Sequence, residues 1–230
     1  MDSVNDMLKR LEQLNVIGAS LSRERDIDRL LESILLAAKT ITHADGGTLY
    51  RLSDDGRSLR FEIIRTDSLH IAMGGTSGIP ISFPDLPLLD AQGAPNDSLV
   101  AAYAAIHQQT VNIVDAYTEP NFDFSGTRQF DERTGYRSQS FLAVPMKNHE
   151  GEIIGVLQLL NARPSGSEVA AFSLSDQSLA ESLASQAAIA LSNRLLMTQL
   201  EELFEAFINL INLAIDEKSH YTGGHCQRVP

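Results

Sequence analysis

The side chains best suited to metal-dependent hydrolysis in this sequence are six histidines, which are scattered along the chain. No two of them stand four residues apart with a third ligand nearby, the spacing typical of a helical zinc site. The nearest pair, His220 and His225, lies five positions apart across a Gly-Gly turn. A hydrolytic centre needs several His and Asp ligands to activate water, so these two residues alone predict no metal site.

Other catalytic patterns are also missing from the sequence. The run "MGGTSG" is not followed by the Lys and Ser or Thr of a phosphate-binding loop, and no Gly-x-Ser-x-Gly elbow occurs. Asp54 and Asp55 stand in a predicted hairpin turn, where carboxylates stabilise the turn. Cys226 is the one cysteine, which excludes an internal disulfide and indicates a reduced, cytoplasmic compartment. We therefore predict no catalytic residues and no enzyme activity in this chain.

The first 40 residues have the periodicity of two helices. Five residues repeat at four-three spacing on one stripe of the first helix: Met7, Leu11, Leu14, Gly18 and Leu21. After a break near "SRERD", Asp26 is a predicted N-cap for a second helix. The apolar face of that second helix consists of Ile27, Leu30, Leu31, Ile34 and Leu35.

The middle of the chain changes to the period of β-strands. "GGTLYRLSDDGRSLRFEIIR" and "SQSFLAVPMKNHEGEIIGVLQLLNA" each predict a hairpin, with turns at "SDDG" and at Asn148–Gly151. Between them, "SLVAAYAAIHQQ" predicts a short helix and "TVNIV" a strand. Residues 67–98 predict a long loop with one short strand near Ile79–Phe83, and residues 115–135 a second loop.

A long helix is predicted from Ser173 onward, where Ser173 and Asp176 fit a capping box. Its core positions alternate in steps of four and three: Leu179, Leu183, Gln186, Ala190, Asn193, Met197, Leu200, Phe204, Phe207, Ile211 and Ala214. Such a long pattern favours a helix that leaves the domain and pairs with a partner helix, with Asn193 setting the register. The alternative is that the first half packs on its own sheet and the second half protrudes.

Together these elements predict an α+β fold: an antiparallel sheet of about six strands with flanking helices and a long C-terminal coiled-coil helix. The net charge of −12 argues against a nucleic-acid partner, because phosphate binding needs basic patches. No run approaches the roughly 18 apolar residues of a membrane span, and the N-terminus lacks the features of a signal peptide. We predict no membrane partner.

Three segments in this order give the sequence a resemblance to the GAF family: "VNIVDAY", "FDERTGYRSQSFLAVPMKN" and "GEIIGVLQLLNA". The likeness covers about residues 10–195 and is strongest to the cyclic-nucleotide-phosphodiesterase type and its bacterial relatives. Separately, "DEKSHYTGGHCQRVP" resembles the opening of an HD-GYP domain, a metal-dependent cyclic di-GMP phosphodiesterase. That resemblance implies a metal-ligand role for His225 only within a complete HD-GYP domain, the only place where divalent metals are expected.

The GAF resemblance implies a small ligand, often cAMP or cGMP, held under a lid. The positions that match the family's pocket contribute two hydroxyls, one carboxylate, one amide, one helix N-terminus and one strand position. They are Thr134, Ser138, Glu132, Gln158, Ala101 and Gly47. A helix N-terminus near Ala101 would suit a cyclic phosphate, and an amide would suit a neutral base edge.

The family's Asn-Lys…Phe…Asp-Glu signature is incomplete here. The residues at these positions are Asn161, Ala162, Phe172, Asp176 and Gln177. In relatives the Lys and the Asp form a structural ion pair, and we predict Arg163 as the substitute for the missing Lys. The departure also favours the alternative of a dimerisation and signal-relay module with a vestigial or empty pocket.

The expected organisation has four parts. Residues 1–24 form an N-terminal dimerisation helix, 25–195 the GAF sensory domain, 196–217 a linker and coiled-coil helix, and 218–230 the truncated start of an HD-GYP domain. The expected partners are a small-molecule ligand and a second copy, bound through the N- and C-terminal helices. The expected function is ligand sensing that controls the HD-GYP phosphodiesterase.

Overall fold

The computed structural model of this protein describes residues 2–164, 166 and 168–218. The chain divides into two compact units, Met1–Leu191 and Ser192–Pro230, which are described separately. The predicted HD-GYP segment, residues 218–230, lies outside the described residues from Ser219 onward, including His225 and Cys226.

Two helices open the first unit. Helix α1 spans Asp2–Leu21 and α2 spans Ile27–Thr42. Asp26 caps α2 as predicted, because its carboxylate accepts a hydrogen bond from the Arg29 amide at 2.9 Å. Helix α2 ends at Thr42, and the C-cap residue His43 adopts the left-handed conformation with φ of 54°.

The centre of the unit is a seven-stranded antiparallel sheet, which confirms the predicted α+β fold. Strand order is β3-β2-β1-β7-β6-β5, with β4 paired to β2. Both predicted hairpins are present, as β1–β2 and β6–β7. The strands are β1 Ala44–Leu52, β2 Ser58–Thr66, β3 Ile71–Gly74, β4 Leu86–Pro87, β5 Val111–Ile113, β6 Phe141–Lys147 and β7 Ile153–Ala162.

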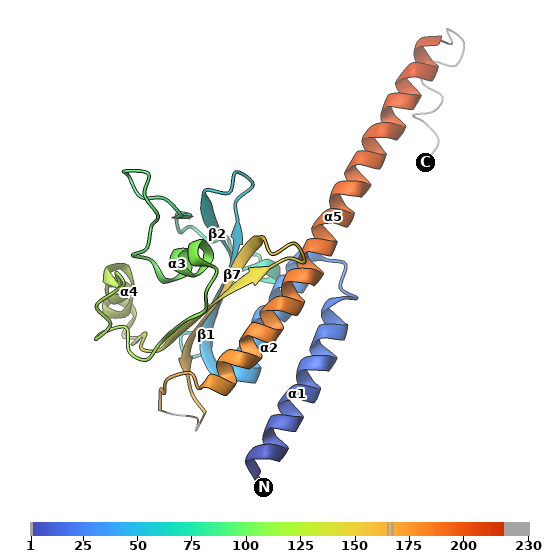
Figure 1. The fold of residues 1–230 in the computed structure, drawn as a ribbon. Coiled ribbons are helices and arrows are strands. Elements are labelled where there is room, and N and C mark those ends of the chain that lie inside the picture. Colours follow the sequence, from blue (N-terminus) through green and yellow to red (C-terminus); the bar gives the residue numbers. More distant parts are fainter. Residues whose placement is uncertain (1, 165, 167, 219–230) are drawn as a thin grey trace. The chain divides into compact units, whose positions relative to one another are not determined.

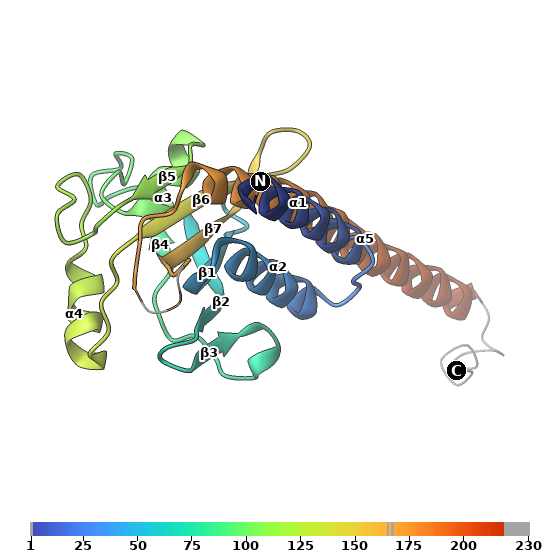
Figure 2. The same cartoon turned by 90° about the horizontal axis from the view of Figure 1, so that it is seen from below.

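Helices cover both faces of this sheet, as Figures 1 and 2 show. Helix α2 and the first part of α5 (Leu174–Lys218) lie on one face, here called the α2 face. Helices α3 (Val100–His107) and α4 (Ser125–Thr134) lie on the other, here called the α3 face. Because side chains alternate along a strand, neighbouring residues of β1, β6 and β7 belong to different cores.

Two local predictions were wrong. Residues 79–83 form no strand; the strands of that region are β3 and β4, on either side of it. Residues 115–135 are not loop throughout, because they include α4. The sequence of α4 is mostly polar and lies largely exposed, so it lacks the apolar periodicity that would have revealed a helix.

Helix α5 begins with the predicted capping box. The Asp176 carboxylate accepts hydrogen bonds from the Ser173 amide at 3.0 Å and hydroxyl at 2.7 Å, while the Asp176 amide donates to the Ser173 hydroxyl at 3.1 Å. Leu179 and Leu183 are buried in the first unit, as expected under the alternative that the first half of this helix packs on its own domain.

The predicted stripe of α1 contacts its own chain. Leu14 and Leu21 are buried within the first unit, and a Cβ added at Gly18 would meet the Gln186 side chain of α5. Leu14 and Leu21 of the predicted stripe therefore pack on the domain to which they belong, and pairing of α1 with a second copy stays a prediction.

The second unit is helical over its described residues, up to Lys218. Most of its apolar side chains are exposed: Leu196, Met197, Leu200, Leu203, Phe204, Phe207, Ile208, Leu210, Ile211 and Leu213. No helix in the described part of the chain combines the length and apolar character that crossing a membrane requires.

Candidate functional site

The α3 face of the sheet carries a continuous apolar cluster. Its buried members come from β1, β2, β5, β6, β7, α3 and the loop that leads to α4: Tyr50, Leu59, Val100, Ala101, Ala104, Ala105, Ile113, Ala116, Phe124, Phe141, Ala143 and Val156. Aromatic rings occupy much of this cluster, with Tyr50 packed on Phe61 at 4.7 Å and Phe124 on Phe141 at 5.1 Å between centroids. The chain's own side chains therefore fill most of this face.

Three side chains on β1 and β7 bring polar groups to this apolar cluster. Thr48 on β1 pairs with Gln158 on β7, and the Tyr50 hydroxyl contacts both of their side chains. Gln158 is half-buried between Val156 and Leu160, which belong to the cluster or pack against it. This polar trio of Thr48, Tyr50 and Gln158 offers both donors and acceptors on an apolar surface, as small-ligand sites commonly do.

Backbone geometry fixes the place of Tyr50. The register of β1 against β2 shifts between Leu49 and Tyr50, and a Cβ added at Gly155 would lie 2.1 Å from the Tyr50 carbonyl oxygen. Glycine at 155 therefore allows β7 to approach β1 at this irregularity. Burial raises the pKa of the Tyr50 hydroxyl well above its ordinary value, although the contacts with Thr48 and Gln158 act in the opposite direction. The hydroxyl is thus a neutral hydrogen-bonding group at physiological pH.

The N-terminus of α3 borders the same cluster. Ala101 belongs to the same buried cluster as Ala143, which is the cross-strand neighbour of Gln158. The N-cap residue Leu99 makes no side-chain hydrogen bond to the helix. The first amides of α3 thus have no capping side chain, which leaves their donors available to an acceptor at this helix end.

Asp131 organises the loop that follows α4. Its side chain is almost fully buried and accepts hydrogen bonds from the Ser138 amide at 2.7 Å, the Ser138 hydroxyl at 2.8 Å and the Tyr117 hydroxyl at 2.8 Å. The bond to Asp131 raises the pKa of Tyr117. Arg137 stacks over the Tyr117 ring, 4.2 Å from its centroid. The carboxylate therefore anchors the "TGYRS" segment to α4.

The six residues predicted to line the pocket do not all meet. Ala101 and Gln158 border one apolar cluster, and Ser138 is buried with its hydroxyl bonded to Asp131. Thr134 and Glu132 are exposed at the end of α4, and the Thr134 hydroxyl donates to the Phe130 carbonyl at 2.8 Å.

Gly47 lies on the opposite side of the sheet from these residues. A Cβ there would lie 2.7 Å from the Leu35 side chain of α2 and 3.2 Å from that of Leu159. The position therefore belongs to the α2 face, where a side chain would collide with the helix, and glycine permits the close packing.

Sequence reasoning missed Thr48 and Tyr50 as part of the site. They stand one and three residues after Gly47, and the alternation of β1 places them on the α3 face. The alternation of side chains along β1 could have predicted this placement, because it puts Gly47 and Thr48 on opposite faces of the sheet. The pairing of Thr48 with Gln158 becomes visible only when the register of β1 and β7 is known.

Asp176, the Asp of the incomplete Asn-Lys…Phe…Asp-Glu signature, forms its ion pair with a residue from another part of the chain. Asp176 pairs with Arg10 of α1 at 2.5 Å, whereas Arg163 lies 3.7 Å from Asp45. The prediction that Arg163 replaces the missing Lys was therefore wrong. An ion pair to a residue 166 positions away could not be derived from local spacing.

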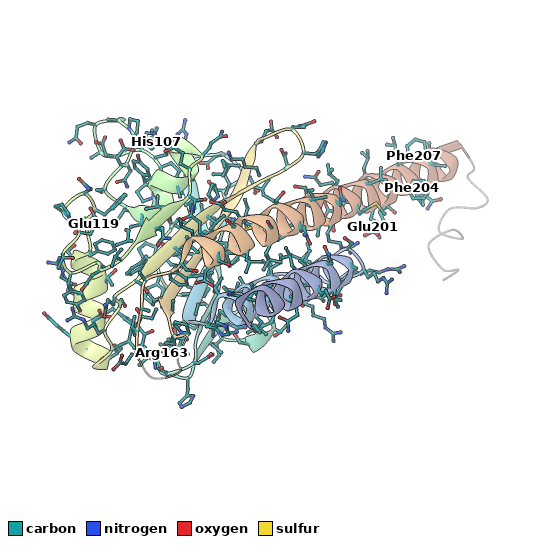
Figure 3. All side chains as sticks on the ribbon, turned by 60° about the horizontal axis from the view of Figure 1, so that its bottom comes forward. His107, Glu119, Arg163, Glu201, Phe204 and Phe207 are labelled. Atoms are coloured by element: carbon teal, nitrogen blue, oxygen red, sulfur yellow. The ribbon has the colours of Figure 1, made fainter. Side chains whose placement is uncertain are left out.

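Two hollows lie outside the apolar cluster of the α3 face. The first hollow has a volume of about 420 Å³ and is lined by α2, the residues that follow it, Asp67 and Arg163. The second has a volume of about 250 Å³ and is lined by residues of β6 and α5 together with Gln108 and Thr110. Figure 3 labels Arg163. Among the described residues, no group of three or more His, Cys, Asp and Glu side chains is arranged to hold a metal ion.

Comparison with known proteins places this fold and site in context. The GAF domain profile matches residues 26–191. Among curated relatives, the dual 3′,5′-cyclic-AMP and -GMP phosphodiesterase 11A of Takifugu rubripes is 32% identical over 123 residues, 52% of this chain and 13% of the relative. The cGMP-specific 3′,5′-cyclic phosphodiesterase of Drosophila mojavensis is 30% identical over 146 residues, 61% of this chain and 12% of the relative. The matched region spans about an eighth of these relatives.

Solved structures agree on the fold. The GAF domain of an Acinetobacter phosphoenolpyruvate-protein phosphotransferase superposes with a TM-score of 0.58 at 15% identity, covering 83% of this chain and 98% of that one. The free methionine-R-sulfoxide reductase of Neisseria meningitidis gives 0.56 at 17% identity, covering 81% and 90%. With its profile match, antiparallel sheet and flanking helices, the chain belongs to the GAF domain family.

Proposed function

We propose that this chain is a regulatory domain that senses a cyclic nucleotide, cAMP or cGMP, on the α3 face of its sheet. The observation that carries the proposal is the polar trio of Thr48, Tyr50 and Gln158, set in an apolar, aromatic-rich surface beside the N-terminus of α3. The phosphodiesterase relatives support the choice of ligand, because their names specify 3′,5′-cyclic nucleotides.

Each part of the ligand has a matching group on this face. The amide of Gln158 donates and accepts, which suits the edge of a neutral base, and Thr48 adds a hydroxyl beside it. The amides around Ala101 suit the cyclic phosphate, since an N-terminal helix dipole favours an anion. Ser138, fixed by Asp131, would hold the covering segment, with Thr134 and Glu132 at its exposed rim.

Binding should appear as thermal stabilisation of the whole chain. A ligand at 100 times its dissociation constant stabilises the native state by about 2.7 kcal/mol, so cGMP or cAMP should raise the melting temperature by several degrees. Differential scanning fluorimetry with both cyclic nucleotides, and with 5′-GMP and 5′-AMP for comparison, measures this shift. Melting curves that stay unchanged up to millimolar concentrations of all four compounds would exclude the proposal.

Replacing Gln158 with leucine tests the site itself. The substitution removes the amide from the apolar cluster, so the shift with cyclic nucleotide should fall by at least half while the fold is retained. Gln92→Leu is the matched control, because Gln92 is exposed in the loop between β4 and α3. Equal shifts for the two variants would place the ligand elsewhere.

We further propose that the domain forms a homodimer through α5 and passes its signal to an HD-GYP cyclic di-GMP phosphodiesterase. The support is the exposed apolar stripe of the second unit, on which Phe204 and Phe207 lie (Figure 3). The run "DEKSHYTGGHCQRVP" adds the resemblance to the HD-GYP opening. Ligand binding would shift the packing of the paired helices.

The relay predicts a distance change between the paired helices. A spin label placed at the exposed residue Gln199 of α5 should report a different inter-copy distance when cyclic nucleotide is added. Double electron–electron resonance on the full chain measures it. An unchanged distance in a sample that binds the nucleotide would argue against signal transfer through this helix.

A second function, a dimerisation and relay module without a ligand, has one observation in its favour. The α3 face is filled by the chain's own aromatic and aliphatic side chains, including Tyr50, Phe61, Phe124 and Phe141. Under this alternative the thermal shift is absent, but self-association through α5 remains. The two measurements together therefore distinguish the alternatives.

A further inference from the structure

Arg10 connects three helices of the first unit. Its guanidinium donates from Nη2 to the Asp176 carboxylate on α5 at 2.5 Å and to the Ile41 carbonyl in the last turn of α2. The Arg10 and Asp176 side chains are 14% and 12% exposed, so the pair is largely shielded from water. Removing one partner of such a pair leaves an uncompensated charge, which is strongly unfavourable.

A second contact fixes the position of α1 two turns further along. A Cβ at Gly18 would lie 1.8 Å from Gln186 Oε1, so the backbone of α1 comes within reach of this α5 side chain. Arg10 meets Asp176 and Gly18 meets Gln186, which shows that α1 and α5 run parallel. Leu14 and Leu21 are buried along the same helix. These contacts and the Arg10–Asp176 pair hold the docked helix against α5 at two points along its length.

The first turn of α5, which Arg10 contacts through Asp176, is also hydrogen-bonded to strand β5 at the edge of the sheet. Asp176, besides binding Arg10, caps the first turn of α5 through Ser173. The Asn112 side chain on β5 donates to the Phe172 carbonyl at 3.1 Å and to Gln177 Oε1 at 3.2 Å. The start of α5 is thus bonded on one side to α1 and on the other to edge strand β5.

The docked position of Arg10 is incompletely satisfied. Its Nε is buried and has no hydrogen-bond partner in the described part of the chain. A buried donor without a partner is unfavourable, because water would satisfy it in an undocked helix. The ion pair favours docking, and the unpaired donor reduces the net stabilisation that Arg10 gives to the docked helix.

We propose that α1 is a releasable arm, held on its own domain by Arg10, and that its release loosens the first turn of α5 together with strand β5. The docked arm also occludes the stripe of Leu14, Gly18 and Leu21, which would otherwise be free to pair with another helix. The docked arm is therefore a contact within one chain that competes with pairing between α1 and another helix. This inference concerns the chain without ligand and does not depend on the proposed nucleotide site.

Hydrogen–deuterium exchange of the whole chain tests the proposal. In Arg10→Met, amides of α1, of residues 174–180 and of β5 should exchange about tenfold faster or more, while β1 and β7 remain as protected as in the wild type. Gly18→Leu should give the same pattern by a different route, because a leucine there would have to displace the Gln186 side chain and separate α1 from α5. Arg29→Met is the matched control, since Arg29 is exposed on α2, and should change none of these segments.

The following results of the exchange experiment would contradict the inference. Unchanged exchange of α1 in Arg10→Met would mean that Arg10 does not hold the arm. Faster exchange of α1 with unchanged α5 and β5 would remove the proposed coupling. Faster exchange of all strands, or failure of both Arg10→Met and Arg10→Lys to fold, would make Arg10 a support of the entire domain and not the attachment of an arm.

Discussion

Replacing Asn161 with alanine is expected to lower the free energy of unfolding by about 3–5 kcal/mol. Asn161 is fully buried, and its side chain makes three hydrogen bonds to backbone: it accepts from the Gln139 and Ser140 amides at 2.7 and 3.2 Å and donates to the Arg137 carbonyl at 2.7 Å. Alanine would leave these three groups without this partner. Chemical denaturation followed by circular dichroism measures the loss.

Two further variants separate the causes of this loss. Asn161 has a φ of 54°, a left-handed conformation that is unfavourable for alanine but not for glycine. Asn161→Gly should therefore be less destabilising than Asn161→Ala by about 1 kcal/mol. Asn161→Asp would bury a carboxylate that faces the Arg137 carbonyl oxygen, so it should be at least as destabilising as Asn161→Ala.

The control for Asn161 is an exposed asparagine. Asn121→Ala removes a side chain that lies on the surface and bonds to Glu119, so its effect should stay within about 0.5 kcal/mol. A loss below about 1 kcal/mol for Asn161→Ala would show that the segment from Arg137 to Ser140 is held mainly by other contacts.

The second large effect is expected on self-association. The double substitution Phe204→Ser and Phe207→Ser should weaken the proposed α5 pairing at least about 100-fold, because two buried aromatic anchors often contribute about 2 kcal/mol each to an interface. In the described second unit these rings are 63% and 56% exposed, with Leu200 and Leu203 beside them in sequence. Sedimentation equilibrium over a range of concentrations measures the change.

The matched control keeps the same helix and the same number of substitutions. Gln199→Ser with Asn209→Ser changes two exposed, uncharged residues between the apolar positions and should leave the association constant unaltered. If the chain sediments as a monomer at all concentrations, or if both double variants associate equally, the stripe is not the interface.

Much of the fold followed from local patterns. The alternation in "GGTLYRLSDDGRSLRFEIIR" and the turn residues of "NHEGE" were sufficient for the two hairpins, because side-chain period and turn chemistry are local properties. Asp26 and Ser173 marked two helix starts, since capping satisfies amides within three residues. Helix α4 was not predicted, because its residues are mostly polar and exposed and show no apolar periodicity.

The sequence by itself therefore determined most of the helices, the two antiparallel hairpins and the family, through short-range periodicity and motifs. Only the tertiary structure decided which residues share the α3 face, because strand register brings Thr48 to Gln158 and turns Gly47 toward α2. It also decided that Arg10, and not Arg163, pairs with Asp176. Helix packing joins positions 166 residues apart, and no local spacing encodes such a contact.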